Sequence, residues 1–170
     1  MVHGEIEVEE NRYRETYGRY YEELEEGAVY EHRPGRTITQ TDAYWFSLLM
    51  TNMHGLHFDE GWGQKTDFGQ CPAPGTMTFG MVSGMSMSDI SYKAVATIGY
   101  EELSLPNPVF PGDTITAESE VLNKRLSESR EGDGIVTVHT RGHNQDGDLV
   151  CEFKRVVLLP TKEKGFIEGY

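Results

Sequence analysis

The 170-residue sequence has few cysteines and few basic residues, and it has no long apolar run. Cys71 and Cys151 are its only cysteines, and their wide separation argues against a disulfide framework and for a reducing compartment. No stretch approaches the about 20 apolar residues that a membrane-spanning helix needs. The first residues also lack the basic-then-apolar pattern of a secretory leader. We therefore expect a cytoplasmic protein.

Positive charge is scarce, because 15 Lys and Arg stand against 28 Asp and Glu and give a formal net charge of −13. An acidic surface of this kind repels phosphate backbones and anionic lipid head groups. The composition therefore argues against nucleic acid and membranes as partners. The 37% of hydrophobic residues is enough for the core of one domain in a chain of this length.

The pattern of charge and hydropathy divides the chain into three segments. Residues 1–18 are densely charged and weakly patterned, so we expect a mobile or loosely docked extension without a catalytic role. Residues 19–162 carry the patterned elements of a single domain, and residues 163–170 form a C-terminal tail. The extension has a helical alternative, based on aromatic and apolar spacing, that would have to run through Gly18.

Two helices are predicted in the first half of the domain. Thr39 and Asp42 offer side-chain oxygens suited to capping a helix in which Trp45 and Leu48 recur at helical spacing. The polar segment 51–60 that follows is expected to be irregular. A second, longer helix is indicated after the prolines that precede Gly75, with methionines four residues apart and small residues between them; such a stripe is typical of a core helix.

The second half of the domain has the composition of strands. Four segments are rich in β-branched and apolar residues with local alternation, and turn residues separate them. These segments are 94–105, 114–126, 134–143 and 148–159. Helices followed by a run of antiparallel strands predict the α+β class.

The segment TNMHGLHFDE at 51–60 resembles the catalytic loop of MaoC-like and R-specific enoyl-CoA hydratases. That loop has the form Asp-x-Asn-Pro-aliphatic-His-x-Asp. In the family, a glycine that starts the central helix follows the His of this loop, and Gly75 follows His57 at the same spacing. The segments 31–47 and 108–114 are similar to the family's opening strand with its first helix and to its recurrent bend before a strand. Together the similarities cover most of the chain.

The resemblance implies a single hotdog fold, in which a curled antiparallel sheet wraps around a long central helix. It implies a homodimer, or a multiple of dimers, with the active site between protomers. It also implies a hydro-lyase that adds water to, or removes it from, a short acyl-CoA, with no cofactor and no metal.

Three residues of the loop depart from the family pattern. Asn52 stands where the family has a carboxylate, His54 replaces the family Asn, and Gly55 replaces the family Pro. The division of labour between a carboxylate and an imidazole therefore cannot be transferred whole to this chain.

The residue chemistry makes His57 the central catalytic candidate, because an imidazole exchanges protons near neutral pH. Asn52 has no useful acid–base capacity, but its amide can orient a water molecule. Gly75, at a helix N-terminus, can offer a backbone N–H to the thioester oxygen. We expect Asp59 to support the loop. His54 is open to three interpretations: an exposed loop residue, a second proton carrier, or a cation that binds an anionic group of the substrate.

Three rival functions are weighed against the hydratase. A metal site could use His54, His57 and Asp59, but no further ligand cluster accompanies them. A hotdog thioesterase would normally carry its Asp or Glu on or beside the central helix. Residues 75–88 contain neither. The third is a non-catalytic acyl-CoA-binding protein. The substitution at Asn52 further suggests a branched or dicarboxylic acyl group of the mesaconyl or methylmalyl type, since it removes a negative charge from the loop.

Overall fold

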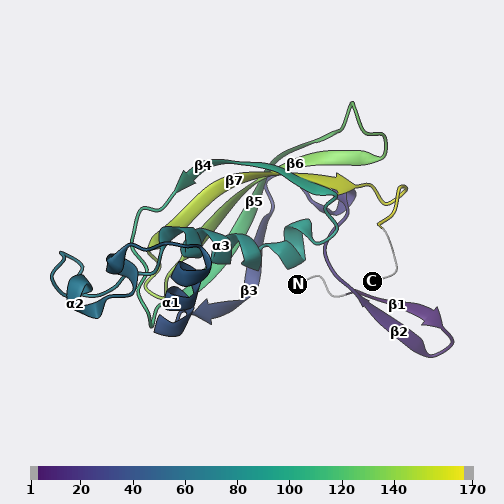
Figure 1. Cartoon of the computed structure of the whole chain (residues 1–170). Coiled ribbons are helices and arrows are strands. Elements are labelled where there is room, and N and C mark those ends of the chain that lie inside the picture. The colour runs from purple at the N-terminus through teal and green to yellow at the C-terminus, as the bar shows by residue number, and fades with distance from the viewer. Residues whose placement is uncertain (1–3, 167–170) are drawn as a thin grey trace.

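The computed structural model describes residues 4–166, and within them it contains one five-stranded antiparallel sheet, a separate hairpin and three α-helices (Figure 1). The strands are β1 (Gly4–Glu9), β2 (Arg12–Thr16), β3 (Val29–Thr37), β4 (Ala96–Ser104), β5 (Thr114–Leu126), β6 (Asp133–His143) and β7 (Leu149–Pro160). The helices are α1 (Gln40–Leu49), α2 (Glu60–Gly63) and α3 (Gly75–Met85), with short 3-10 turns at Tyr21–Glu23 and Gly55–His57 and a π-helical turn at Met87–Ser91.

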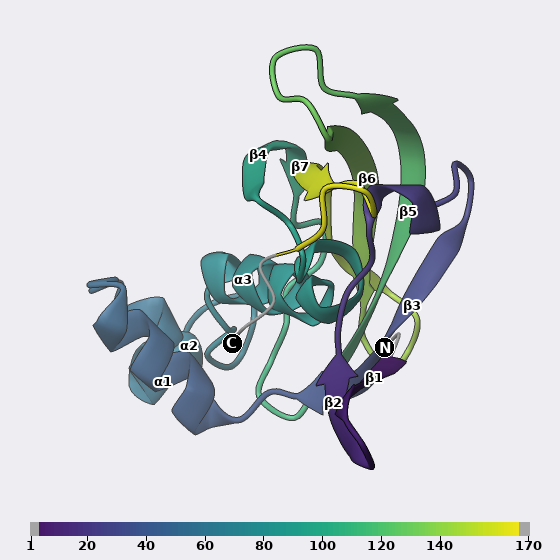
Figure 2. The ribbon, with the colours of Figure 1, turned by 90° about the vertical axis from the view of Figure 1, so that its right-hand side faces the viewer.

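The large sheet has the strand order β3-β5-β6-β7-β4 and curls around α3, which lies inside its curve (Figure 2). Buried and half-buried residues alternate along β6, as expected for a strand with one face on a core. Gly142 in β6 leaves room for Val82 of α3, because a Cβ at this glycine would collide with the valine side chain. The helix can therefore pack closely on the sheet. This is the arrangement that the resemblance implies.

Two hydrophobic clusters fill the space between α3, its π-helical extension and the sheet. The first lies along α3 and includes Met77, Val82, Ile115 and Phe153. The second lies beyond the C-terminal end of the helix and contains Leu24, Ile90, Val121, Val136, Val138, Val157 and Leu159. Met77 is thus a core residue, as the methionine stripe predicted.

The four predicted strands of the second half are confirmed as β4 to β7, with ends that differ from the predicted ends by at most two residues. The predicted turn residues include Gly132 and Gly147, which lie in the turns that join β5 to β6 and β6 to β7 and have positive φ angles of 76° and 86°. The thiols of Cys71 and Cys151 are free and buried. Burial raises the pKa of Cys151 to about 12, so this thiol is unsuited to act as a nucleophile.

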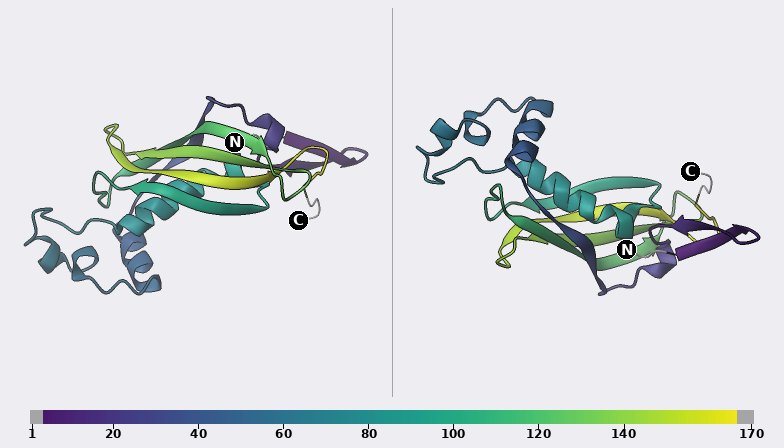
Figure 3. Two further views of the ribbon diagram at one scale, coloured as in Figure 1. Left: turned by 90° about the horizontal axis from the view of Figure 1, so that it is seen from above. Right: turned by 90° about the horizontal axis from the view of Figure 1, so that it is seen from below.

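The described part of the N-terminal extension forms the hairpin β1–β2, which projects from the body at the end opposite α1 and α2 (Figure 3). The helical alternative for this segment is wrong. Tyr13 lies in a strand, and Gly18 has a φ of 73°, which a right-handed helix does not allow. The mobility of the extension stays a prediction, and residues 167–170 of the predicted tail lie outside the described residues.

None of the helices within residues 4–166 combines the length and the apolar composition needed to span a bilayer.

Candidate active site

The start of α1 is fixed by the two residues that the sequence indicated. Thr39 accepts a hydrogen bond from the backbone N–H of Asp42 at 3.1 Å, and the Asp42 carboxylate accepts one from the backbone N–H of Thr39 at 2.9 Å. This reciprocal capping box satisfies two N–H groups that would otherwise lack acceptors. It holds the helix in place at the point where the chain enters the catalytic loop.

The end of α1 contains a backbone conformation that the sequence did not indicate. Thr51 has a φ of 53°, in the left-handed region that β-branched residues rarely adopt. The next residue, Asn52, donates its backbone N–H to the carbonyl of Ser47 at 2.9 Å, which closes the helix end in the manner usually built with glycine. A non-glycine residue in this region costs about 1–3 kcal/mol, so the packing around the loop must maintain it.

His57 sits at the end of the 3-10 turn and is half-buried. Its Nδ1 lies 2.9 Å from the carbonyl oxygen of Pro72. Because a carbonyl only accepts hydrogen bonds, Nδ1 carries the proton, and in the neutral ring Nε2 has a free lone pair. No residue in the described part of the chain forms a hydrogen bond with Nε2. The ring is therefore held in place by one nitrogen and is available for proton transfer at the other.

His57 and Gly75 line the same cavity, which has a volume of about 430 Å³. The other lining side chains are mainly apolar. They come from the loop and the segment between α2 and α3, from α3, from the bend before β5 and from β7, and they include Leu56, Phe68, Thr78, Leu105, Pro108 and Val150. None of the lining residues is an Asp or Glu. The structure thus brings His57, the predicted proton carrier, and Gly75, the predicted backbone donor, to one cavity.

Gly75 is the first residue of α3, directly after Pro74. Within residues 4–166 its backbone N–H has no acceptor, as is usual in the first turn of a helix. A Cβ at this position would lie 2.7 Å from a methyl carbon of Leu105, so glycine allows that side chain to cover the helix end. The positive end of the helix dipole and a free donor are therefore directed toward the cavity.

Asn52 and His54 lie on the loop but are not among the residues that line the His57 cavity. The Asn52 side-chain oxygen accepts from the backbone N–H of His54 at 3.1 Å. Nδ1 of His54 accepts from the N–H of Leu56 at 3.2 Å, and the ring centroids of His54 and His57 are 6.0 Å apart. In this arrangement both side chains bond to the loop backbone.

Asp59 caps the short helix α2, where its carboxylate accepts from the backbone N–H of Trp62 at 3.1 Å. It has no hydrogen bond to His57 in the part of the chain described. Residues 4–166 contain no group of three or more His, Cys, Asp or Glu side chains placed to hold a metal ion. The geometry of Asp59 matches a role in supporting the loop.

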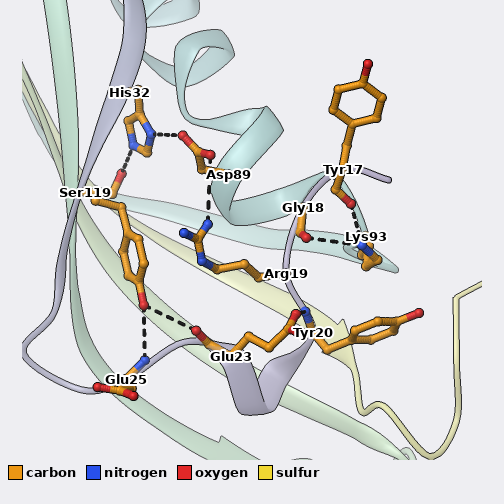
Figure 4. Close-up of polar contacts among 11 residues, drawn as sticks. Tyr17, Gly18, Arg19, Tyr20, Glu23, Glu25, His32, Asp89, Lys93 and Ser119 are labelled. Atoms are coloured by element: carbon orange, nitrogen blue, oxygen red, sulfur yellow. Dashed lines mark hydrogen bonds and ion pairs between the residues drawn. The ribbon is translucent and has the colours of Figure 1, made fainter. Parts of the chain in front are cut away.

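Sequence reasoning missed a second polar cluster, which lies at the other end of the central helix (Figure 4). Nδ1 of His32 lies 2.9 Å from the Asp89 carboxylate, and Nε2 lies 2.8 Å from the Ser119 hydroxyl. Ser119 in turn contacts the Thr140 hydroxyl at 2.8 Å, and Arg19 lies 3.9 Å from Asp89. His32, Asp89 and Ser119 come from β3, the π-helical turn and β5, respectively. No local motif could therefore have indicated them.

This second cluster has the connectivity of a serine–histidine–aspartate triad but not the access that a triad needs. His32, Asp89 and Ser119 are 1%, 2% and 0% exposed. Both ring nitrogens of His32 have partners, and the Ser119 hydroxyl is shared with Thr140. A substrate cannot reach the serine, and the cluster therefore joins the helix end to the sheet.

Comparison with known proteins supports the resemblance seen in the loop. A family model described as mesaconyl-CoA hydratase matches residues 6–169. A mesaconyl-CoA hydratase from Cereibacter sphaeroides is 34% identical over 147 residues, which cover 86% of this chain and 42% of that protein. An (R)-specific enoyl-CoA hydratase from Aeromonas caviae is 32% identical over 115 residues, which cover 68% of this chain and 81% of that protein. The chain thus spans less than half the length of the first relative and most of the second.

Solved structures show the same architecture. A MaoC-like dehydratase from Rhodospirillum rubrum has a TM-score of 0.76 and 25% identity, and the match covers 85% of this chain and 98% of that one. A double-hotdog protein from Mycobacterium tuberculosis has a TM-score of 0.78 at 22% identity, covering 90% of this chain and 48% of that one. The predicted α+β hotdog, with a curled sheet around a central helix, is confirmed.

Proposed function

The chain belongs to the mesaconyl-CoA hydratase family, and on that basis we propose that it is a hydro-lyase that hydrates a short enoyl-CoA or dehydrates the corresponding 3-hydroxyacyl-CoA. One observation carries the proposal. His57, with an unprotonated and unpaired Nε2, lines the same cavity as the free backbone N–H of Gly75, and both occupy the motif positions of the family.

The two groups suit the two requirements of the reaction. Nε2 of His57 takes a proton from water as the water oxygen bonds to the β-carbon, and the same nitrogen then delivers a proton to the α-carbon. Meanwhile negative charge develops on the thioester oxygen, where the Gly75 N–H and the helix dipole stabilise it. The sum is one water added across the double bond, and no cofactor enters the balance.

No carboxylate is among the residues that line the cavity. In this proposal the His57 imidazole therefore carries out both proton transfers. In this proposal Asn52 acts indirectly, because its side chain keeps the loop closed by accepting the His54 N–H. Asp59 acts in the same supporting sense through its cap on α2. The apolar walls match an acyl chain, and a volume of about 430 Å³ suits a short one.

The replacement of the family carboxylate by Asn52 also bears on the acyl group. Asn52 lies outside the cavity lining, so a carboxylate at this position would repel an anionic substrate group from a distance, and by less than the about 4 kcal/mol of two unit charges about 4 Å apart at an effective dielectric constant of about 20. A neutral Asn52 avoids this repulsion and favours a dicarboxylic monothioester such as mesaconyl-CoA. A cationic His54 is a less favourable source of specificity, because protonation at Nδ1 would break its bond from the Leu56 N–H.

A homodimer is part of the proposal. β4 is an edge of the five-stranded sheet, and its Ile98, Tyr100 and Leu103 side chains are exposed. Trp45 and Leu49 on α1 are also exposed, and such apolar surfaces usually mark an interface. Association through these surfaces would cover them and enclose the cavity. Light scattering that shows an active monomer at micromolar concentration would contradict this part.

The activity is tested by incubating the full chain with a panel of enoyl-CoA thioesters and following the absorbance of the conjugated thioester. The proposal expects a time-dependent loss of this absorbance, with faster turnover of mesaconyl-CoA than of crotonyl-CoA. A thiol reagent is added in parallel. Release of free CoA without hydration would indicate the thioesterase alternative, and tight binding without any turnover would indicate an acyl-CoA-binding protein.

A further inference from the structure

Thr78 is a buried polar residue in the candidate cavity that the mechanism above does not use. It lies in α3, one turn after Gly75, and lines the cavity with Gly75 and His57. Its exposure is only 3%. Even so, its hydroxyl has no hydrogen-bond partner among residues 4–166.

Among the buried hydroxyls within residues 4–166, this lack of a partner is shared only by Ser91, which is not among the residues that line the His57 cavity. Ser47 and Ser86 each donate to a backbone carbonyl within their own helical segments, at 2.9 and 2.7 Å. Ser119 and Thr140 bond to each other. The carbonyl of Pro74, one turn before Thr78, instead receives the backbone N–H of Thr78 itself at 3.2 Å. The Thr78 side chain lines the cavity and its hydroxyl has no partner within residues 4–166, so this hydroxyl is placed to donate to a bound ligand.

Helix geometry brings the hydroxyl and the free backbone donor together. Residues three apart lie on the same face of a helix, and side chains tilt toward the helix N-terminus. The Thr78 side chain therefore leans toward the turn in which Gly75 begins the helix. Two hydrogen-bond donors, one from the backbone and one from a side chain, thus face the same end of the cavity as His57.

We propose that the Thr78 hydroxyl is a second donor to the thioester oxygen of the acyl-CoA and completes an oxyanion site with the Gly75 N–H. The inference rests on the proposed hydratase function. Negative charge on this oxygen is greatest when the β-carbon has bonded to water, so the hydroxyl stabilises the transition state more than the bound substrate. Thr78 is a neutral donor and contributes no proton to the balance of the reaction.

The kinetic test compares Thr78→Val with Thr78→Ser. Valine has the shape of threonine without the hydroxyl, and serine keeps the hydroxyl without the methyl group. We expect Thr78→Val to lower kcat by about 10-fold or more with little change in KM, and Thr78→Ser to remain within about threefold of wild type. The control is Thr76→Val on the exposed side of the same helix, which should leave kcat unchanged. An unchanged kcat for Thr78→Val, an equal loss in Thr78→Ser, or a change in KM alone overturns the assignment.

A spectroscopic readout separates this inference from the proposed function. Butyryl-CoA carrying ¹³C at the thioester carbon cannot be hydrated, and its carbonyl stretch moves to lower frequency when the oxygen accepts hydrogen bonds. Wild type and Thr78→Ser should shift the stretch more than Thr78→Val does. Equal shifts in all three proteins overturn the role of Thr78 alone. A wild type that neither binds butyryl-CoA nor hydrates any enoyl-CoA overturns the proposed function itself.

Discussion

A histidine side chain lies beside each end of the central helix, and the surroundings of the two rings differ. At the N-terminal end, His57 is fixed by Pro72 through Nδ1, while Nε2 has no partner within residues 4–166. Beyond the C-terminal end, His32 is bonded through both nitrogens, to Asp89 and to Ser119, and is 1% exposed. The second ring has more polar partners, yet only the first has a nitrogen free for a substrate. A catalytic imidazole is thus recognised by the nitrogen that the protein leaves unpaired.

The contrast extends to the neighbouring helix turns. In the first turn of α3, the Gly75 N–H and the Thr78 hydroxyl have no partners among residues 4–166 and lie beside a cavity. The π-helical turn at Met87–Ser91 instead carries Asp89 into a network of buried groups, and the buried Ser91 hydroxyl of this turn, which lines no part of the His57 cavity, has no partner within residues 4–166. Unsatisfied donors cost stability, and a folded chain tolerates them where a ligand will satisfy them. Under the proposed function, the packing at the C-terminal end contributes stability and the N-terminal end carries the reaction.

The largest expected effect is on catalysis at the N-terminal end. His57→Gln keeps a side chain that can hydrogen-bond to Pro72 but removes the proton acceptor. We expect the hydration rate to fall by about 100-fold or more, because general acid–base catalysis contributes at least this much. The melting temperature should stay near that of wild type, since His57 is only half-buried. A variant with a near-normal rate would remove His57 from the mechanism.

The opposite pattern is expected at the C-terminal end. Asp89→Leu removes the acceptor of the buried His32 N–H, and leaving such a donor unsatisfied costs about 1–3 kcal/mol of unfolding free energy. Urea denaturation measures this loss. The rate per folded molecule should stay within about threefold of wild type. A large loss of rate in the folded variant, with no loss of stability, would contradict the division of roles between the two ends.

A smaller, pH-dependent part of the stability should also come from the same end. Burial lowers the pKa of His32 more than its bond to Asp89 raises it. Burial raises the pKa of Asp89, but its hydrogen bonds and nearby positive charges together hold it below its usual value. Both groups therefore bind protons more readily in the unfolded chain, so stability is present at neutral pH and is lost as the pH falls.

This loss should begin near the ordinary histidine pKa of about 6.5 and continue below the ordinary aspartate pKa of about 3.9. Urea titrations at several pH values provide the measurement. His32→Gln serves as the control, because it cannot titrate and should flatten the part of the curve near neutral pH. A wild type whose stability rises between neutral and mildly acidic pH would refute the sign.

The smallest expected effect concerns substrate choice. Asn52→Asp restores a carboxylate to the loop and should lower the ratio of kcat/KM for mesaconyl-CoA to that for crotonyl-CoA several-fold. The matched variant Asn52→Ser can still accept the His54 N–H without adding charge, and it should leave the ratio near that of wild type. An unchanged ratio in Asn52→Asp would exclude charge repulsion as the reason for the asparagine.

The features that could be predicted from the sequence are those with local signals. Alternation and turn residues predicted β4 to β7, and the Thr39–Asp42 pair predicted the start of α1. The loop motif indicated His57 and Gly75, which the structure brings to one cavity. These signals depend on residues that lie close together in the chain.

The features that were missed depend on contacts between distant residues or on rare conformations. His32 and Asp89 are 57 positions apart, and only the curl of the sheet around the helix brings them together. Thr51 adopts a conformation that its residue type disfavours, so propensity argues against it. In the sequence Thr78 looks like an ordinary core-helix residue, and only the folded structure shows that its hydroxyl has no partner within residues 4–166.

The most direct test of the central claim is the fate of labelled water. Mesaconyl-CoA is incubated with the full chain in H₂¹⁸O, and the products are resolved by mass spectrometry. A hydratase site at the N-terminal end of α3 predicts an intact CoA thioester with one ¹⁸O on its acyl chain, and no such product from His57→Gln. Label in a free carboxylic acid together with released CoA, or equal hydration by His57→Gln, would contradict it.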